Sequence, residues 1–170
     1  MSGRATGWCH IPPGSTLGLV HLALDGRGTV RLATPDPLAP PAITFGFLAS
    51  EYDMRAMVAG VALARRIISQ PAMRPYVVEE LVPGHGAGRA SEVQAFIRRV
   101  GVTNHHPSSS CAMGIGSHSV VDPRLRVQGI DGLRVADASI MPSVVAGNTN
   151  APSIMIGEKA AAMILEDAAA

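Results

Sequence analysis

The last third of the chain carries side chains suited to acid–base, nucleophilic or metal chemistry. Residues 105–114 read HHPSSSCAMG, and His118 follows, so three imidazoles and one thiol lie within fourteen residues. Their spacing matches no common zinc pattern, and adjacent histidines rarely face one ion, so we expect no metal site. No G-x-S-x-G motif surrounds the serines, so the run does not support a serine nucleophile. On these residues alone, a loop with a histidine pair and a hydroxyl-rich turn is the simplest interpretation.

Two further positions have residue types that suit ligand binding. The run GLRVAD over 132–137 predicts a short buried strand that ends in Asp137. An acid at the carboxyl end of such a strand lies where α/β folds bind ligands, although a cap or turn residue explains Asp137 equally well. Asn150 is a good cap for a helix over 150–167, with Pro152 in its first turn. The backbone donors at that helix start can face a ligand that is or becomes anionic, and an ordinary Asn cap is the plainer alternative.

Other elements must hold these residues in place. The apolar runs 18–24 and 29–34 flank the Gly-rich stretch 25–28, which predicts a β-hairpin. The prolines of 35–41 remove backbone donors and exclude a regular ladder, and 42–47 is a short extended segment. The Gly-rich loop over 83–88 is a weak match to a phosphate cradle because no clear strand precedes it.

Two helices are predicted before the histidine run. One starts at Ser50, where Asp53 completes a pattern that resembles a capping box, and it ends at Gln70-Pro71. The other covers 91–100, with four apolar residues facing inward: Val93, Phe96, Ile97 and Val100. The predicted fold class is therefore α+β, an antiparallel sheet with flanking helices.

Composition narrows the class of protein. Of the 170 residues, 47% are hydrophobic and 16% are charged, and 14 basic and 13 acidic residues give a net charge of +1. This balance predicts a soluble globular protein, with no nucleic-acid surface and no membrane span. Cys9 and Cys111 fit no C-x-x-C pattern and are expected to be free thiols. Residues 1–10 do not resemble a signal peptide, so a cytoplasmic location is predicted.

Three motifs in order point to a family. They are HHPSSSCAMG over 105–114, VDPRLRVQGIDGLRVADASIMP over 121–142 and GNTNAPSIMIGEKAA over 147–161. Together they resemble the carboxy-terminal signature of glucose–methanol–choline (GMC) oxidoreductases, most closely their branch of choline dehydrogenase-like, FAD-dependent alcohol dehydrogenases. The run RGTVRLATPDPLAPPAI over 27–43 resembles the substrate domain of the same family. The resemblance covers nearly everything after about residue 18.

The resemblance implies roles for particular residues. In this family an alcohol carbon gives a hydride to the flavin while a histidine removes the hydroxyl proton, and the histidine before proline in the first motif is His106. Imidazole titrates near working pH, which suits that role. The second active-site residue of the family corresponds to Asn150, whose amide would hold the alcohol oxygen. The resemblance also makes the following residues flavin neighbours: Asp137, Ala138, Asn150, Ala151 and Pro152.

The resemblance also implies a division of the chain. Residues 1–17 are a loop or a leader outside the family pattern. Residues 18–104 are a portion of the substrate-binding domain, and 105–170 are a catalytic loop with a strand and a helix that complete a flavin domain. The FAD-binding amino-terminal half of such enzymes has no counterpart here and is the implied partner, together with a small primary alcohol.

Two consequences follow from that missing partner. The isolated chain is expected to bind flavin weakly or not at all, to turn over nothing alone, and to expose an apolar docking face open to self-association. A non-catalytic remnant or interaction module with the same fold is the alternative function.

Overall fold

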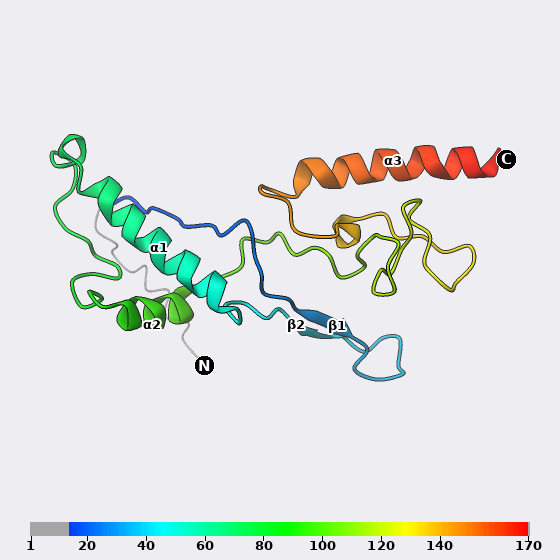
Figure 1. The fold of residues 1–170 in the computed structure, drawn as a ribbon, viewed down its shortest axis with the longest axis horizontal. Helices are drawn as coiled ribbons and strands as arrows, with labels where there is room; N and C mark the ends of the chain where they lie inside the picture. The colour runs from blue at the N-terminus through cyan, green and yellow to red at the C-terminus, as the bar shows by residue number, and fades with distance from the viewer. Residues whose placement is uncertain (1–13, 170) are drawn as a thin grey trace, which may run out of the picture.

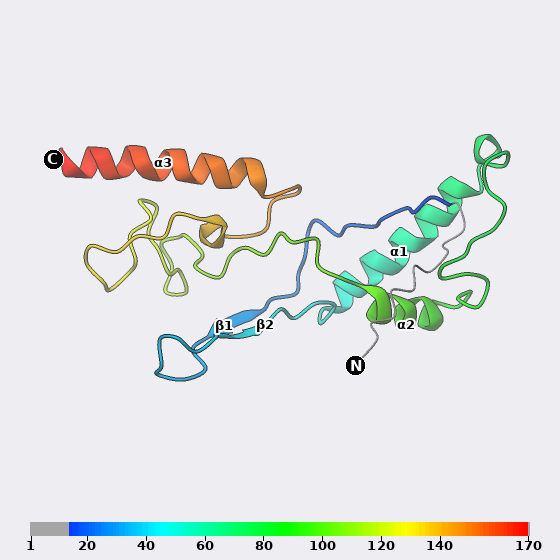
Figure 2. The ribbon, with the colours of Figure 1, turned by 180° about the vertical axis from the view of Figure 1, so that it is seen from behind.

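The computed structural model describes residues 14–169, which form an extended molecule with three long or medium helices and one small sheet (Figure 1). In chain order the elements are β1 (Thr29–Arg31), β2 (Ala42–Thr44), α1 (Glu51–Ile68), the 3₁₀ turn η1 (Pro71–Met73), α2 (Ala90–Val100), the 3₁₀ turn η2 (Ala138–Ile140) and α3 (Asn150–Ala168). Helices α1 and α2 lie together at one end, and α3 lies at the other (Figures 1 and 2). Three sequence predictions fall on residues outside this range. They concern the absence of a signal peptide in 1–10, the free thiol of Cys9, and most of the 1–17 leader.

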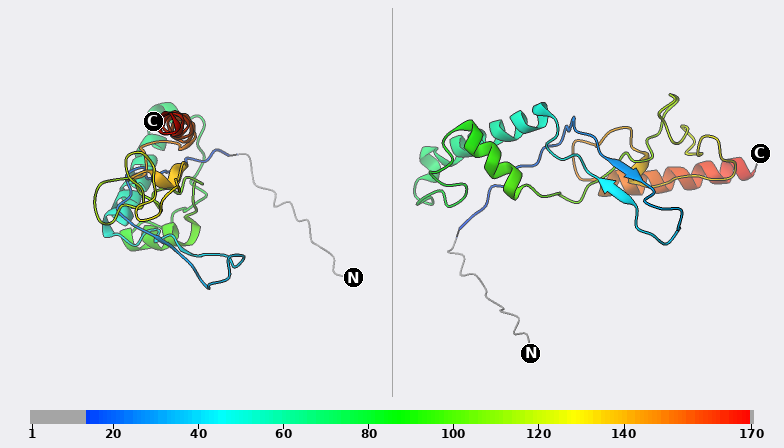
Figure 3. Two further views of the ribbon diagram at one scale, coloured as in Figure 1. Left: turned by 90° about the vertical axis from the view of Figure 1, so that its right-hand side faces the viewer. Right: turned by 90° about the horizontal axis from the view of Figure 1, so that it is seen from below.

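The sheet differs from the predicted hairpin. β1 pairs with β2 in antiparallel register, with Val30 opposite Ile43, and residues 18–24 form no strand. The proline-rich segment 35–41 connects β1 to β2 as a loop, consistent with its missing backbone donors. The hairpin projects away from α1 and α2 (Figure 3), and all six strand residues are exposed. The α+β class therefore holds only as a mixture of helices and one two-stranded sheet, which α1 and α2 do not cover.

A buried carboxylate explains why 18–24 does not join the sheet. Asp53, 1% exposed in α1, accepts hydrogen bonds from the backbone amides of Asp25 (2.9 Å) and Gly26 (2.8 Å). His21 Nε2 lies 3.1 Å from the same carboxylate. Burial alone would raise the pKa of Asp53, but the two amide hydrogen bonds and His21 together hold it below its usual value. The segment is thus tied to the helix and cannot pair with β1.

The same contact corrects the predicted capping box at the start of α1. Ser50 is the N-cap, and its hydroxyl accepts a hydrogen bond from the Tyr52 amide at 3.1 Å. Asp53 points instead toward 21–26, so it does not complete the box. The predicted start and end of this helix are otherwise confirmed, since α1 runs from 51 to 68 and stops before Gln70-Pro71.

A first apolar core joins α1 to α2. Its buried residues are Met54, Val61, Ala87, Val93 and Ile97. The predicted inward positions Val93 and Ile97 are confirmed, and Phe96 packs against this core while partly exposed. Val100 is 44% exposed and the prediction for it was wrong. As the last residue of α2, it has no following turn of its own helix to cover it.

A second apolar core joins α3 to the segment before it. Its buried residues are Val121, Leu125, Ile140, Met141, Ile156 and Ala160. The predicted buried strand over 132–137 is absent. Arg134 makes only an isolated bridge to Arg126, and Leu133 is 48% exposed. Two backbone hydrogen bonds flank that bridge, from the Val127 amide to the Leu133 carbonyl (2.9 Å) and from the Val135 amide to the Leu125 carbonyl (3.1 Å). The pairing goes no further, so the run forms no strand.

An ionic cluster holds the far end of α3. Asp167 pairs with Arg124 at 2.7 Å and also with Arg126 and Arg134. Hydrogen bonds from Arg126 and Arg134, followed by the effect of Arg124, keep the pKa of Asp167 well below its usual range. Arg124 also bonds the backbone oxygen of Met163 in the last turns of α3, where cations are favoured. The helix is therefore attached by an apolar core and by charge. No helix within 14–169 is long and apolar enough to cross a membrane.

Candidate active site

His106 is held against the beginning of α3. Its Nδ1 lies 2.9 Å from Oγ1 of Thr149, which is 43 residues further along the chain. His106 is half-buried, whereas the neighbouring His105 is exposed and has a positive φ of 61°. The backbone amide of His105 bonds Oγ1 of Thr103 at 3.0 Å. The local bend thus separates the two histidines, and His106 is the one directed to the helix.

The histidine segment also runs beside the second motif. The amides of Cys111 and Met113 donate to the carbonyls of Ser139 (2.9 Å) and Ile140 (2.8 Å). A weaker bond of 3.4 Å joins the Ser109 amide to the Ala138 carbonyl. Asp137, an exposed residue, is the N-cap of η2, and its carboxylate accepts the Ser139 amide at 2.7 Å. The cap interpretation of Asp137 is therefore confirmed, and Ala138 lies alongside the histidine segment.

Helix α3 begins at Asn150, the residue predicted as its cap, so the observed cap lies one residue earlier. Thr149 is the N-cap, and Asn150 is the first helical residue, so the cap prediction for Asn150 was wrong. Asn150 and Ala151 are exposed, and Pro152 is half-buried. The first amide to enter the helical ladder is that of Ser153, which bonds the Thr149 carbonyl at 3.0 Å. The amides of Asn150 and Ala151 precede that bond and are available to an acceptor outside the helix.

The three sequence motifs therefore meet in space. The first and third are joined by His106 and Thr149, and the first and second by the hydrogen bonds to 138–140. Thr149 is a site residue that the sequence analysis missed. The signal was its residue type, because threonine directly before Asn-Ala-Pro is itself a favoured cap.

The other candidate ligands are not assembled into a metal site. Within residues 14–169 no group of three or more histidine, cysteine, aspartate or glutamate side chains is arranged to hold a metal ion. His105 and His118 are exposed, and Cys111 is a free thiol. Adjacent histidines rarely face one ion, and here only His106 is directed to α3.

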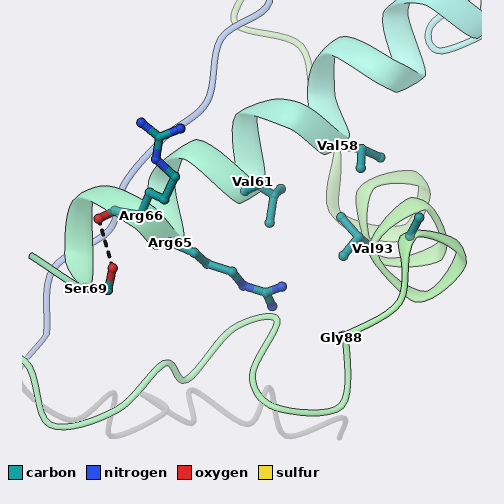
Figure 4. Close-up of a pocket in the computed structure, with 9 residues that line it drawn as sticks. Val58, Val61, Arg65, Arg66, Ser69, Gly88 and Val93 are labelled. Carbon is teal, nitrogen blue, oxygen red and sulfur yellow. Dashed lines mark hydrogen bonds between the residues drawn. The ribbon is translucent and has the colours of Figure 1, made fainter.

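A cavity of about 530 Å³ lies elsewhere, between α1, α2 and the loop before α2 (Figure 4). Figure 4 shows Arg65 reaching into it beside Val61 and Val93. The Arg65 guanidinium is occupied by Glu80 at 3.1 Å and by the Ala87 carbonyl at 2.9 Å. None of the lining residues belongs to 105–169, so this cavity is separate from the His106 site.

Comparisons with known proteins identify the family of the chain. Residues 25–157 match the carboxy-terminal part of the family described as GMC oxidoreductase. The chain is 42% identical over 152 residues to alcohol dehydrogenase [acceptor] of Pseudomonas putida, covering 89% of this chain and 28% of that protein. It is 44% identical over 135 residues to an oxygen-dependent choline dehydrogenase of Yersinia pseudotuberculosis, covering 79% of this chain and 24% of that protein.

Solved structures give the same result. Pyridoxine 4-oxidase from Mesorbium loti superposes with a TM-score of 0.77 at 33% identity, over 83% of this chain and 28% of that one. A formate oxidase of Aspergillus oryzae, whose structure concerns FAD modification, superposes with a TM-score of 0.70 at 29% identity, over 83% of this chain and 25% of that one. The chain thus spans about a quarter of the length of the relatives it matches. With the family match and the three converging motifs together, the chain belongs to the GMC oxidoreductase family, whose carboxy-terminal region it represents.

Proposed function

We propose that this chain supplies the carboxy-terminal catalytic portion of an FAD-dependent alcohol oxidoreductase that oxidises a primary alcohol to an aldehyde. His106 is the general base that takes the hydroxyl proton, and Asn150 holds the alcohol oxygen. The observation that carries this proposal is the hydrogen bond of 2.9 Å between His106 and Thr149. It sets one imidazole beside the residue that precedes Asn150, so the two side chains share one end of α3.

The side chains of His106 and Asn150 suit proton transfer from an alcohol. Nδ1 of His106 is engaged by Thr149, which leaves Nε2 for the substrate. A neutral imidazole offers one lone pair, and a positioned base of this kind typically contributes about 10²- to 10⁴-fold in rate. The side-chain amide of Asn150 bonds the alcohol oxygen. It stays uncharged, so it does not compete with His106 for the hydroxyl proton.

The residues at the start of α3 fit a flavin ring. The N-cap Thr149 makes no side-chain cap bond, so no side chain of its own covers the amides of Asn150 and Ala151. Pro152 has no amide hydrogen, and these two donors remain for the ligand. A bound FAD would supply the hydride acceptor, whose ring would become more negative beside these donors. Fixed donors and the positive end of a helix dipole stabilise such charge. Asp137 and Ala138, next to the histidine segment, are the other proposed flavin neighbours.

The apolar surface of α3 supports docking of a larger FAD-binding portion. Ile156 and Ala160 face the core of the chain. Ile154 and Leu165, eleven residues or about three turns apart, lie on the opposite face, and they are 61% and 71% exposed. A helix that is apolar on both faces is typical of one buried on both sides. We therefore propose that 105–170 completes a flavin domain and that 18–104 is part of the substrate domain.

A chimera tests this function. The matched carboxy-terminal part of the Pseudomonas putida alcohol dehydrogenase, 28% of that protein, is replaced by this chain. The chimera is purified with FAD and assayed for oxidation of primary alcohols with an artificial electron acceptor. His106→Gln should lower kcat by about 10²- to 10⁴-fold, whereas His105→Gln, at the adjacent exposed histidine, should change it by less than about threefold.

Further variants of the chimera separate a catalytic portion from a non-catalytic module. Asn150→Ala should raise KM and lower kcat while the flavin stays bound. Equal losses for His105→Gln and His106→Gln would contradict the assignment of the base. A folded chimera that retains FAD and oxidises no alcohol would favour the alternative of a non-catalytic module.

A further inference from the structure

Thr149 occupies a capping position without capping. Threonine is favoured at an N-cap because its hydroxyl oxygen accepts an amide of the first turn, and such caps have extended backbone angles. Thr149 has φ −85° and ψ −1°, and its side chain makes no cap bond. Its hydroxyl instead lies 2.9 Å from Nδ1 of His106, in a residue that is only 9% exposed. The side chain has therefore given up its usual local role for a contact with the histidine.

The backbone of Thr149 is firmly held. Its carbonyl accepts hydrogen bonds from both the amide (3.0 Å) and the hydroxyl (2.6 Å) of Ser153. In contrast, Thr149 makes the only hydrogen bond to the His106 ring that the described part of the chain provides. One fixed hydroxyl thus sets the orientation of an imidazole that lies on an irregular segment.

We propose that Thr149 is a positioning residue that keeps His106 in the tautomer with the proton on Nδ1, so that Nε2 carries the lone pair that takes the alcohol proton. This inference rests on the proposed function for its role in turnover, but not for the tautomer itself. A neutral imidazole donates from one nitrogen and accepts at the other, and an imidazolium donates from both. A hydroxyl oxygen that accepts from Nδ1 keeps its bond in both states. A hydroxyl that donates to Nδ1 would lose its acceptor when the ring is protonated.

The first test reads the tautomer in the 170-residue chain itself. Nitrogen-15 chemical shifts of the imidazole rings are measured by long-range proton–nitrogen correlation, and His106 is assigned as the signal lost in His106→Gln. In the native chain and in Thr149→Ser, which keeps the hydroxyl, Nδ1 should be the protonated nitrogen. Thr149→Val, which keeps the shape and lacks the hydroxyl, should shift His106 toward the Nε2-protonated form.

A matched control is available in the same loop. Thr103 offers its hydroxyl to the amide of His105, so Thr103→Val removes a threonine hydroxyl near the histidine pair without touching the His106 ring. It should leave the His106 shifts unchanged. The proposal is overturned if native His106 carries its proton on Nε2, or if Thr149→Val leaves the tautomer as it was.

The second test measures turnover in the chimera described above. Thr149→Val should lower kcat by about 10- to 100-fold, by analogy with the loss that follows when a hydrogen bond orienting a metal-binding histidine is removed. Thr149→Ser should restore kcat to within about threefold, with KM little changed in both. If His106→Gln leaves turnover intact, the proposed function fails while the tautomer result still stands. If His106→Gln abolishes turnover and Thr149→Val changes neither tautomer nor kcat, the role of Thr149 is refuted.

Discussion

The attachment of α3 can be tested by deleting one side chain from its buried face. Ile156 is 5% exposed and belongs to a core of only six buried residues. Truncating a buried isoleucine to alanine typically costs about 2–5 kcal/mol. Alanine is the better helix former by about 0.4 kcal/mol, which offsets a little of this loss. We expect Ile156→Ala to weaken the docking of α3 by about 2–4 kcal/mol.

Ile154 provides the matched control on the same helix. It is 61% exposed, so Ile154→Ala has the same gain in helix propensity with little loss of burial. The assay is amide hydrogen exchange in the second half of α3, under conditions where closing is faster than exchange. Since 1.4 kcal/mol corresponds to a factor of ten, Ile156→Ala should speed exchange by about 30- to 700-fold and Ile154→Ala by less than about threefold. Equal effects of the two changes would refute the assigned buried face.

Three further outcomes are expected. Asp53→Asn should lower the free energy of unfolding of the α1–α2 end by about 2 kcal/mol in chemical denaturation, because it weakens hydrogen bonds to a buried carboxylate. Asp131→Asn, at an exposed residue, is the control, and an equal loss of stability there would contradict this. Asp167→Asn should loosen α3 at neutral pH in hydrogen exchange. The pKa of Asp167 in the folded chain lies below the unfolded value of 3.8. Its stabilising effect is therefore present above about pH 4 and is lost as pH falls through the folded pKa, so the exchange rates of the native chain and the variant should converge in acid. A difference in exchange rate that grows in acid would contradict this. The purified chain, mixed with FAD and desalted, should retain no flavin absorbance. Dinucleotide affinity depends on a phosphate-binding helix start, to which this sequence offers only the weak match at 83–88. Stoichiometric flavin would contradict this expectation.

The helices were predictable because their signals are local. The apolar spacing and the Ser50 cap set α1 within one residue of its observed start, and Gln70-Pro71 marked its end. The alanine-rich stretch after Pro152 likewise predicted α3 to within one residue. Motif order was equally accessible, since the three runs along 105–161 can be compared with a family without any coordinates.

The errors share one physical cause, which is that distant partners compete with local patterns. Residues 18–24 have a strand-like composition, yet Asp53, 28 residues from Asp25, binds the adjoining backbone and removes the segment from the sheet. The run 132–137 reads as a strand, but its pairing with 125–127 stops at one isolated bridge and does not extend into a ladder. A strand depends on a partner that its own residues do not specify.

The candidate site divides in the same way. Its residue types were visible along the chain, with His106 and Asn150 named by their motifs. The tertiary structure decided that His106 rather than His105 turns toward α3, and that Thr149, 43 residues away, holds its ring. A hydrogen bond across that separation depends on how the second core sets α3 against the histidine segment, and no local spacing encodes it.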